Sequence, residues 1–299
     1  PDLLKPDEIR LHTINDVIEY NPLAIFACGN IIYHFLPGIK VSVFHGYPIG
    51  KRGEKSSATD DHFSIRGWFD MYCTQGPSST EYFKQLEAKH QFFKVYQTGW
   101  AKVDDYFSSY KKENDVPTIL YATTFSKGIT SAPVLVDTIS RLVKEKKWNW
   151  RLTFHPKLND QALLDRYRAL ADEYSNVTFV DNVRLEDFQQ SDVMLCDSSS
   201  IILEFMMMNK PVVTYRNTNP GQHLLNVTEV SEVENAIETA LTRPASLMKE
   251  VNDFAHYHEA YRDGRNCERI LDAVDDFNSN YKGKIKAKPL NLWRKFRLR

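Results

Sequence analysis

Residues 192–205 read DVMLCDSSSIILEF and join three features in one short stretch. An apolar run of strand length leads into Asp197 and three serines, and helical spacing begins at Ile201. A strand that ends in small polar residues and continues into a helix is the repeating unit of parallel α/β sheets. The stretch therefore predicts an α/β fold with a polar site at the carboxyl end of this strand.

The same alternation of short apolar runs and helical patterns extends over most of the chain. Runs bounded by polar residues and separated by helices indicate parallel strands joined by crossovers. Predicted strands cover residues 23–28, 41–44, 71–74, 118–121, 150–154, 177–180, 192–196 and 212–215, and predicted helices cover residues 79–90, 132–146 and 162–174.

A polar stretch at residues 106–117, closed by a proline, divides these elements into two series and predicts an interdomain linker. The second series holds about five strand–helix repeats, which is a complete doubly wound domain. The first series holds fewer strands than such a domain usually has, so we expect it to be incomplete at its N-terminus. The predicted domains are residues 1–110 and 111–280, followed by a separate tail at residues 281–299.

The composition of the 299 residues, 42% hydrophobic and 26% charged, is that of a globular protein and excludes disorder. No apolar run approaches the roughly 18 residues that a membrane span needs. The first residues, PDLLKPDEIR, are polar, and we expect no signal peptide. Four scattered cysteines exclude a disulfide framework and structural zinc, so a soluble protein in the reducing cytoplasm is expected.

The last 18 residues hold eight of the 38 basic residues and none of the 39 acidic ones. The rest of the chain therefore has 30 basic against 39 acidic residues, which excludes a general nucleic-acid binder. Residues 282–299 combine these cations with leucines, a tryptophan and a phenylalanine, a mixture that suits an anionic membrane surface. A disordered solubilising end and an RNA-binding segment are the alternatives.

Two histidines directly follow predicted strands, one in each domain. His45 precedes Gly46, which lets the backbone approach a ligand closely, and His155 precedes Pro156, which ends its strand. Ligands of open α/β sheets bind beyond the carboxyl ends of the strands. We therefore interpret His45 and His155 as catalytic groups that face one cleft between the domains, the alternative being two histidines that cap turns.

The serine cluster after residues 192–196 predicts a phosphate site. Free N–H groups at the start of a helix, with hydroxyls beside them, bind anions, although one serine would suffice as a helix cap. Glu204 lies one turn into the helix, where a carboxylate can accept hydrogen bonds from ribose hydroxyls. The predicted donor-binding residues of this stretch are Asp197, Ser198, Ser199, Ser200 and Glu204.

A second phosphate contact is predicted at Thr124 and Lys127, in the loop that follows residues 118–121. A plain surface loop is the alternative. Acidic pairs in the chain lie in polar or helical contexts rather than after strands, so neither a metal nor a cofactor is expected.

Six short motifs, in order, resemble the CDP-glycerol glycerophosphotransferase family, the teichoic-acid primases and polymerases of GT-B architecture. The resemblance covers most of the chain from about residue 41 onward. Departures from the family pattern are Ala101 in place of proline, Ser126 in place of arginine, Ser198 in place of tyrosine and Glu204 in place of aspartate. The segments that carry the resemblance are HGYP at 45–48, TGWAKVD at 98–104, LYATTF at 120–125, HP at 155–156, CDSSS at 196–200 followed by EF at 204–205, and DGR at 263–265 with Arg269.

This resemblance implies two Rossmann-like domains with a cleft between them, the first on the acceptor side and the second binding the nucleotide-linked donor. It implies that glycerol phosphate, or a related polyol phosphate, is transferred from a CDP-linked donor to a polyol-phosphate or glycan hydroxyl. His45 and His155 match the two histidines that the family needs for activity. The lipid-linked acceptor of such a reaction places the enzyme at the inner face of the cell membrane.

Two other functions remain open from the sequence. A GT-B nucleotide-sugar glycosyltransferase or sugar-nucleotide epimerase would share the architecture, and an epimerase would need further acid–base groups near the sugar. A catalytically silent module that binds an anion at the serine cluster is the third possibility.

Overall fold

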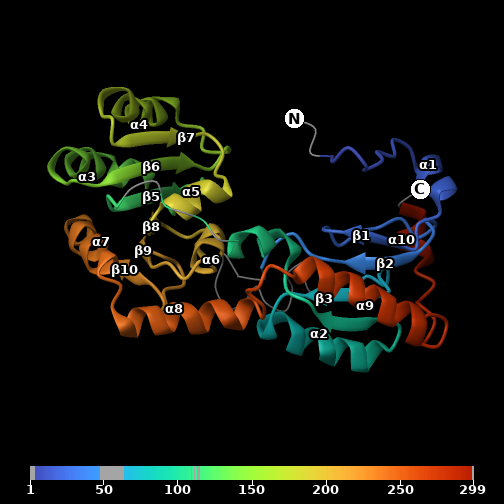
Figure 1. The fold of residues 1–299 in the computed structure, drawn as a ribbon. Helices are drawn as coiled ribbons and strands as arrows, with labels where there is room; N and C mark the ends of the chain where they lie inside the picture. The colour runs from blue at the N-terminus through green and yellow to red at the C-terminus, as the bar shows by residue number, and fades with distance from the viewer. Residues whose placement is uncertain (1–3, 48–63, 109, 111, 113–114, 298–299) are drawn as a thin grey trace. The chain divides into compact units, whose positions relative to one another are not determined.

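The computed structural model describes all residues except 1–3, 48–63, 109, 111, 113–114 and 298–299. The described residues form two compact units (Figure 1). Unit 1 combines residues 4–47 and 64–101 with residues 265–297, and unit 2 runs from Lys102 to Gly264. Unit 1 is therefore made of segments from both ends of the chain.

Unit 1 is built on a parallel sheet, with strand order β1-β2-β3-β4 among the described residues. Its first helix begins at a capping box, in which Thr13 and Asp16 each bind the other's backbone N–H. The elements of this unit are α1 (Ile14–Tyr20), β1 (Ala24–Ala27), β2 (Ile39–Ser42), β3 (Met71–Thr74), α2 (Pro77–His90), β4 (Lys94–Gln97), α9 (Asn266–Asn280) and α10 (Leu292–Arg297).

Successive residues of β3 pack into two different cores, because side chains of a strand alternate between the faces of its sheet. Tyr72 joins an aromatic cluster that includes Phe83 of α2. Met71 and Cys73 join a second cluster that includes Phe277 of α9. Helices α2 and α9 therefore cover opposite faces of the unit 1 sheet.

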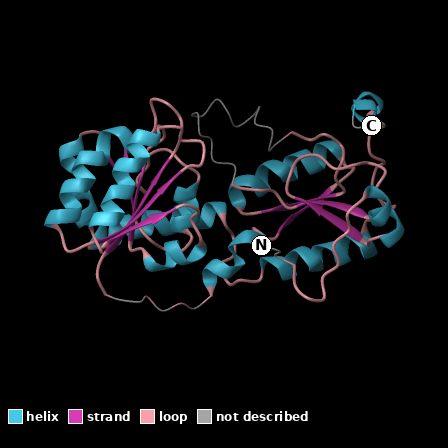
Figure 2. Cartoon of the chain, turned by 90° about the horizontal axis from the view of Figure 1, so that it is seen from above, coloured by secondary structure: helices cyan, strands magenta, loops and turns pink. Residues whose placement is uncertain are grey.

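Unit 2 has a parallel sheet of strand order β10-β9-β8-β5-β6-β7 in the described part, which is the doubly wound 3-2-1-4-5-6 order. Figure 2 shows helices on both sides of its strands. The elements are η3 (Ala101–Phe107, which begins at the boundary), β5 (Thr118–Thr123), α3 (Ala132–Glu145), β6 (Asn149–Phe154), α4 (Gln161–Glu173), β7 (Val177–Val180), α5 (Leu185–Gln190), β8 (Val193–Cys196), α6 (Ile201–Met206), β9 (Val212–Tyr215), β10 (Leu225–Val227), η4 (Val230–Glu232), α7 (Val233–Leu241) and α8 (Ala245–His258).

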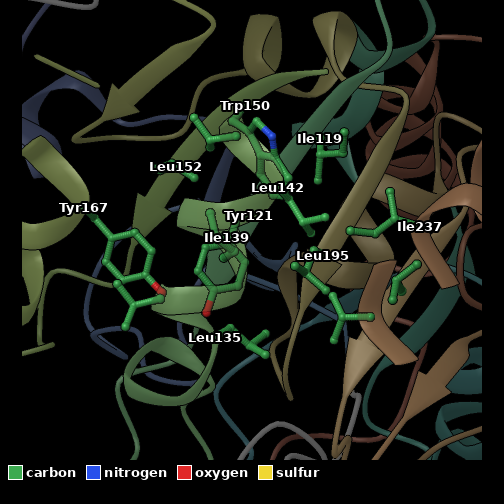
Figure 3. Close-up of a cluster of buried hydrophobic side chains, with 14 of the residues drawn as sticks. Ile119, Tyr121, Leu135, Ile139, Leu142, Trp150, Leu152, Tyr167, Leu195 and Ile237 are labelled. Atoms are coloured by element: carbon green, nitrogen blue, oxygen red, sulfur yellow. The ribbon is translucent and has the colours of Figure 1, made fainter. Parts of the chain in front are cut away.

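The core of unit 2 lies between β5 and the helices that cover it. All six residues of β5 are buried, as a central parallel strand requires. Helix α3 turns an apolar stripe toward them, with Leu135, Ile139 and Leu142 fully buried at helical spacing. Figure 3 shows these side chains beside Tyr121 and Trp150.

The α/β architecture and most of the predicted elements are confirmed, with differences of three kinds. Strand β2 ends at Ser42 rather than at Phe44, and β4, β10 and several helices are further elements that the sequence analysis does not include. The division between the units falls at Lys102, several residues before the expected boundary. Part of the expected linker, residues 109, 111, 113 and 114, lies outside the described residues.

The third difference is that residues 265–280 belong to unit 1 and not to the second domain. The two chain connections between the units run close together. On the unit 2 side a Cβ on Gly264 would lie 3.1 Å from the carbonyl oxygen of Asp104. On the unit 1 side Asn266 Nδ2 donates to the carbonyl of Trp100 at 3.1 Å.

Across the described residues, no helix is long and apolar enough to cross a membrane.

Removing the ring of Phe277 should destabilise unit 1 alone. The side chain is 2% exposed against the sheet, and truncating a buried phenylalanine to alanine typically costs about 3–5 kcal/mol. We expect Phe277→Ala to speed hydrogen exchange of the β2 and β3 amides and to leave β5 and β8 unchanged. Leu271→Ala, at a position 56% exposed on the same helix, is the control. Equal exchange in both variants would contradict the assignment of α9 to unit 1.

Candidate functional site

Unit 2 contains a cavity of about 530 Å³ at the carboxyl ends of its central strands. This volume is within the range of about 300–1,000 Å³ typical of small-molecule sites. Three strands contribute lining residues at or after their carboxyl ends: Ala122 to Thr124 at β5, Thr153 to Pro156 at β6, and Asp181 to Arg184 after β7. The helices contribute Leu185 and Phe188 of α5, and Lys102, Asp105 and Tyr106 of η3. The start of α6 and the loop before it contribute Ser199, Ser200, Ile201 and Glu204.

The cavity lies where the strand order of the sheet reverses. Strand β5 pairs with β6 on one side and with β8 on the other. The connections that leave β5 and β8 therefore diverge and leave a crevice outside the carboxyl ends of the strands, which is where open α/β sheets bind ligands. This position agrees with the expected location of the site in the second domain.

Asp197 joins the two loops that border the crevice. Its carboxylate accepts hydrogen bonds from the backbone N–H of Thr124 at 2.9 Å and of Ser131 at 3.0 Å, and from Ser131 Oγ at 3.3 Å. Burial raises the pKa of Asp197, and the hydrogen bonds from Ser131 and Thr124 act in the opposite direction. Asp197 has no exposed surface, so a positioning role replaces the direct ligand contact expected from the sequence.

The three serines that follow Asp197 differ in their surroundings. Ser198 Oγ accepts a hydrogen bond from the backbone N–H of Thr218 at 2.8 Å, and Ser198 lines a separate hollow of about 70 Å³. The expected phosphate contact of Ser198 is therefore replaced by a contact to the loop after β9. Ser199 and Ser200 line the main cavity, and no hydrogen bond occupies either hydroxyl among the described residues.

Helix α6 contributes less to the site than its sequence suggests. It spans only six residues, from Ile201 to Met206. The macrodipole is a sum over aligned peptide units, so a helix of this length supplies little of it. Binding of an anion here would depend mainly on the hydroxyls of Ser199 and Ser200 and of the neighbouring Thr124.

Glu204 lines the cavity and is held by η3. Its Oε2 atom accepts hydrogen bonds from Lys102 Nζ at 2.7 Å and from Tyr106 Oη at 2.8 Å. Burial, together with the charge and hydrogen bond of Glu204, raises the pKa of the Tyr106 phenol, which therefore remains a donor. Both donors contact Oε2, so Oε1 is left to accept a hydrogen bond from a ligand hydroxyl, the role expected for Glu204.

His155 borders the cavity at the end of β6. The backbone N–H of Lys157 donates to Nδ1 of His155 at 3.1 Å. A backbone N–H can only donate, so in the neutral ring the proton is on Nε2. The ring also packs against Phe125, with centroids 4.3 Å apart. His155 is therefore oriented as a hydrogen-bond donor from Nε2.

His45 lies in unit 1 and has the opposite tautomer. Its Nδ1 is 3.1 Å from the carbonyl oxygen of Cys28, and a carbonyl can only accept. Nδ1 therefore carries the proton, and Nε2 of the neutral ring is a base. In their neutral forms, His45 can therefore accept a proton at Nε2, whereas His155 can donate one from Nε2.

The loop that carries His45 is held in a constrained conformation. Phe44 is buried at φ +57°, a left-handed backbone conformation that is uncommon for a bulky residue. Trp100 Nε1 donates to the carbonyl of Phe44 at 3.3 Å, and Gln75 Nε2 donates to the carbonyl of Gly46 at 2.7 Å. Gly46 is thus bound through its carbonyl within unit 1, and Pro48 of the same motif lies outside the described residues.

The remaining predicted residue, Lys127, is exposed and does not line the cavity, so the structure gives no support to its expected phosphate contact.

The sequence analysis also missed residues that do line the cavity. Arg184 follows β7, and its polar neighbourhood DNVR at the end of a strand is the signal that could have indicated it. Lys102 and Tyr106 come from η3; Lys102 lies in the TGWAKVD segment of the family resemblance, but neither residue directly follows a predicted strand. Nowhere in the described ranges do three His, Cys, Asp or Glu side chains group as metal ligands.

Comparison with known proteins places the chain among sugar-nucleotide enzymes and their structural relatives. A family model described as UDP-N-acetylglucosamine 2-epimerase matches residues 122–275, just over half of the chain. A search of curated proteins finds no significant match. The solved structures share the fold at low sequence identity.

Three of these structures illustrate the likeness. A Listeria monocytogenes protein assigned as a UDP-N-acetylglucosamine 2-epimerase has a TM-score of 0.59 at 16% identity, over 89% of this chain and 77% of that one. The wall teichoic acid polymerase TagF, soaked with CDPG, has a TM-score of 0.58 at 14% identity, over 85% and 71%. Staphylococcus aureus MnaA in complex with UDP has a TM-score of 0.57 at 16% identity, over 93% and 85%.

The topology and these neighbours define a GT-B-type α/β fold, with two Rossmann-like domains that each carry a parallel sheet. This confirms the expected fold class. Within it, the chain belongs to the UDP-N-acetylglucosamine 2-epimerase family. The expected likeness to teichoic-acid polymerases is found at the level of the fold, and the family match favours the epimerase alternative.

Changing Asp197 to Asn should loosen the crevice. The N–H of Thr124 donates to both carboxylate oxygens and that of Ser131 to one of them, so an amide in either orientation would turn its NH2 group toward a buried N–H donor, at a cost of about 1–3 kcal/mol. We expect urea denaturation to show this loss in the free energy of unfolding of unit 2. Asp181→Asn, whose side chain is 80% exposed at the cavity rim, is the matched control. Equal stability of the two variants would contradict the positioning role of Asp197.

Proposed function

We propose that the chain is an enzyme that binds a nucleoside-diphosphate-linked sugar in the cavity of unit 2 and changes the configuration of its sugar. The observation that carries the proposal is the cavity at the strand reversal, bordered by the hydroxyls of Ser199 and Ser200 and by His155. In this proposal those groups donate hydrogen bonds to the diphosphate oxygens, and Glu204 accepts one from the ribose. The family match over residues 122–275 supports a UDP-linked N-acetylhexosamine as the substrate.

Epimerisation needs acid–base groups near the sugar, because a proton must leave one face of a carbon and return to the other. Three carboxylates line the cavity beside His155, those of Asp105, Asp181 and Glu204. Glu204 is engaged by η3, so Asp105 and Asp181 are our candidates for proton transfer. In this proposal, Asp105 and Asp181 are the further acid–base groups that an epimerase would need near the sugar.

Transfer of a polyol phosphate from a CDP-linked donor is the second candidate, and the opposite tautomers of the two histidines favour it. In this reaction the acceptor hydroxyl attacks the outer phosphorus of the donor, Nε2 of His45 takes its proton, and CMP leaves with the electrons of the broken P–O bond. Nε2–H of His155 donates to the phosphoryl oxygens as charge develops on them. The acceptor would be a polyol phosphate or glycan, lipid-linked at the inner face of the membrane.

Calorimetric titration with UDP, CDP and GDP separates the two candidates. We expect UDP to bind most tightly, and the Ser199→Ala, Ser200→Ala double variant to weaken binding by about tenfold or more, since a hydrogen bond to a charged group contributes about 1.5–3 kcal/mol. Ser246→Ala, an exposed serine that does not line the cavity, should bind like the unchanged protein. A preference for CDP would favour phosphate transfer, and the absence of any nucleotide binding would overturn both candidates.

Histidine variants test the chemistry. His155→Ala should lower kcat by about 10² or more in the reaction that the enzyme catalyses, the usual scale for such groups. If that reaction is transfer from CDP-glycerol, His45→Ala should lower kcat to a similar extent, measured as release of CMP. His12→Ala, an exposed histidine of unit 1, is the control. Turnover close to that of the unchanged protein in His155→Ala would remove this residue from the mechanism.

A further inference from the structure

Unit 1 contains a second cavity, of about 380 Å³, lined by five basic side chains. We call it the tail cavity, because residues 286–294 of the basic tail form one of its walls. The basic residues that line it are Arg66, Lys89, His90, Lys286 and Arg294. Among the described residues that line it, none is acidic, so the cavity has a positive potential.

Contacts to the backbone hold the tail in place, together with the ion pair of Lys288 with Asp70. Asn291 Nδ2 and Arg294 Nη1 donate to the carbonyl of Arg66 at 2.9 and 3.0 Å. The backbone N–H of Lys286 donates to the carbonyl of Gln91 at 3.1 Å. Lys286 and Arg294, the two tail cations that line the cavity, are thus positioned by backbone hydrogen bonds, which leave their charges without an acidic partner among the described residues.

Gly67 explains how the tail packs so closely. Its φ is +77°, and a Cβ at this position would lie 2.5 Å from Asn291 Nδ2 and 2.9 Å from Pro289 Cγ. A side chain at residue 67 would therefore displace the tail from its contact with this turn. The cavity is a product of the folded unit and not of a loose basic end.

Carboxylates on the adjoining elements are engaged by other lysines. Asp70 forms an ion pair with Lys288 at 2.7 Å, and Glu87 forms ion pairs with Lys84 and Lys94. Inside the cavity the basic groups repel each other, and burial together with the charges of Lys89 and Lys286 lowers the pKa of His90. An anionic ligand would relieve this repulsion.

Exposed apolar side chains lie on the tail next to these cations. Leu292, Trp293 and Phe296 of α10 are 71%, 67% and 74% exposed, and the rings of Trp293 and Phe296 are stacked. Aromatic and leucine side chains beside cations are typical of segments that lie in a membrane interface. Water-exposed rings of this kind are unfavourable in solution and favourable in the boundary between headgroups and acyl chains.

We propose that the tail cavity binds the phosphate of an anionic phospholipid headgroup while Trp293 and Phe296 enter the lipid interface. Arg66, Lys286 and Arg294 supply donors to the phosphate oxygens, and α10 lies at the membrane surface. The proposal concerns unit 1 alone and is independent of the substrate bound by unit 2. It gives the basic tail a specific binding site in place of general charge attraction.

Cosedimentation of the full chain tests the proposal with vesicles of phosphatidylcholine alone and of phosphatidylcholine mixed with phosphatidylglycerol. We expect binding only to the mixed vesicles. A basic residue near an anionic surface contributes about fivefold to binding, so the loss of two charges alone costs about 30-fold. Lys286→Gln, Arg294→Gln should weaken binding by more than that, because it also removes donors to the headgroup phosphate. The control is Lys282→Gln, Lys284→Gln, which removes the same charge from exposed tail positions that do not line the cavity.

Equal loss in the two double variants would overturn the headgroup site, since it would mean that only the total charge matters. Calorimetry with glycerol 1-phosphate adds a second measurement: tight binding of this soluble phosphate without vesicle binding would also overturn the lipid assignment. Trp293→Ser, Phe296→Ser should weaken vesicle binding and leave glycerol phosphate binding unchanged. UDP and CDP titrations of the same variants should match the unchanged protein, which separates this proposal from the function of unit 2.

Discussion

The carboxylate of Asp197 is the contact on which the geometry of unit 2 depends. It lies without solvent exposure at the end of β8 and accepts hydrogen bonds from the backbone of Thr124 and Ser131, beyond the end of β5. Two strands that are far apart in sequence are thereby joined at their carboxyl ends. Among the described residues these N–H groups have no other partner, so a change of loop position would leave buried donors without acceptors. This side chain thereby holds the loop that carries Thr124 against the end of β8, from which the serines of the cavity follow.

The two histidines show how neighbouring backbone groups can determine the chemistry of a side chain. A carbonyl next to His45 requires a proton on Nδ1, whereas an N–H next to His155 requires a lone pair there. The same residue type is thus a base in one unit and a donor in the other. Each assignment depends only on which backbone group the ring meets.

Local patterns in the sequence predicted much of the fold. The strand of residues 192–196, the serines after it and the helix that follows were predictable because apolar runs and turn residues are local signals. Glu204 was identified from its spacing, but its partners Lys102 and Tyr106 were not, since they lie about a hundred positions earlier in the chain. The burial of Asp197 and the membership of α9 in unit 1 likewise depend on tertiary contacts that no short window contains.

The place of α9 in unit 1 has a consequence for biosynthesis. A ribosome delivers the four described strands of that unit before residues 102–264 of unit 2, and only afterwards the helix whose Ile270, Val274 and Phe277 cover one face of the first sheet. In the described residues unit 2 is a single run from Lys102 to Gly264, which can fold as it emerges, since domains generally fold as units during translation. The sheet of unit 1 must wait with an uncovered apolar face until α9 is made, so strands synthesised before unit 2 reach their native state after it.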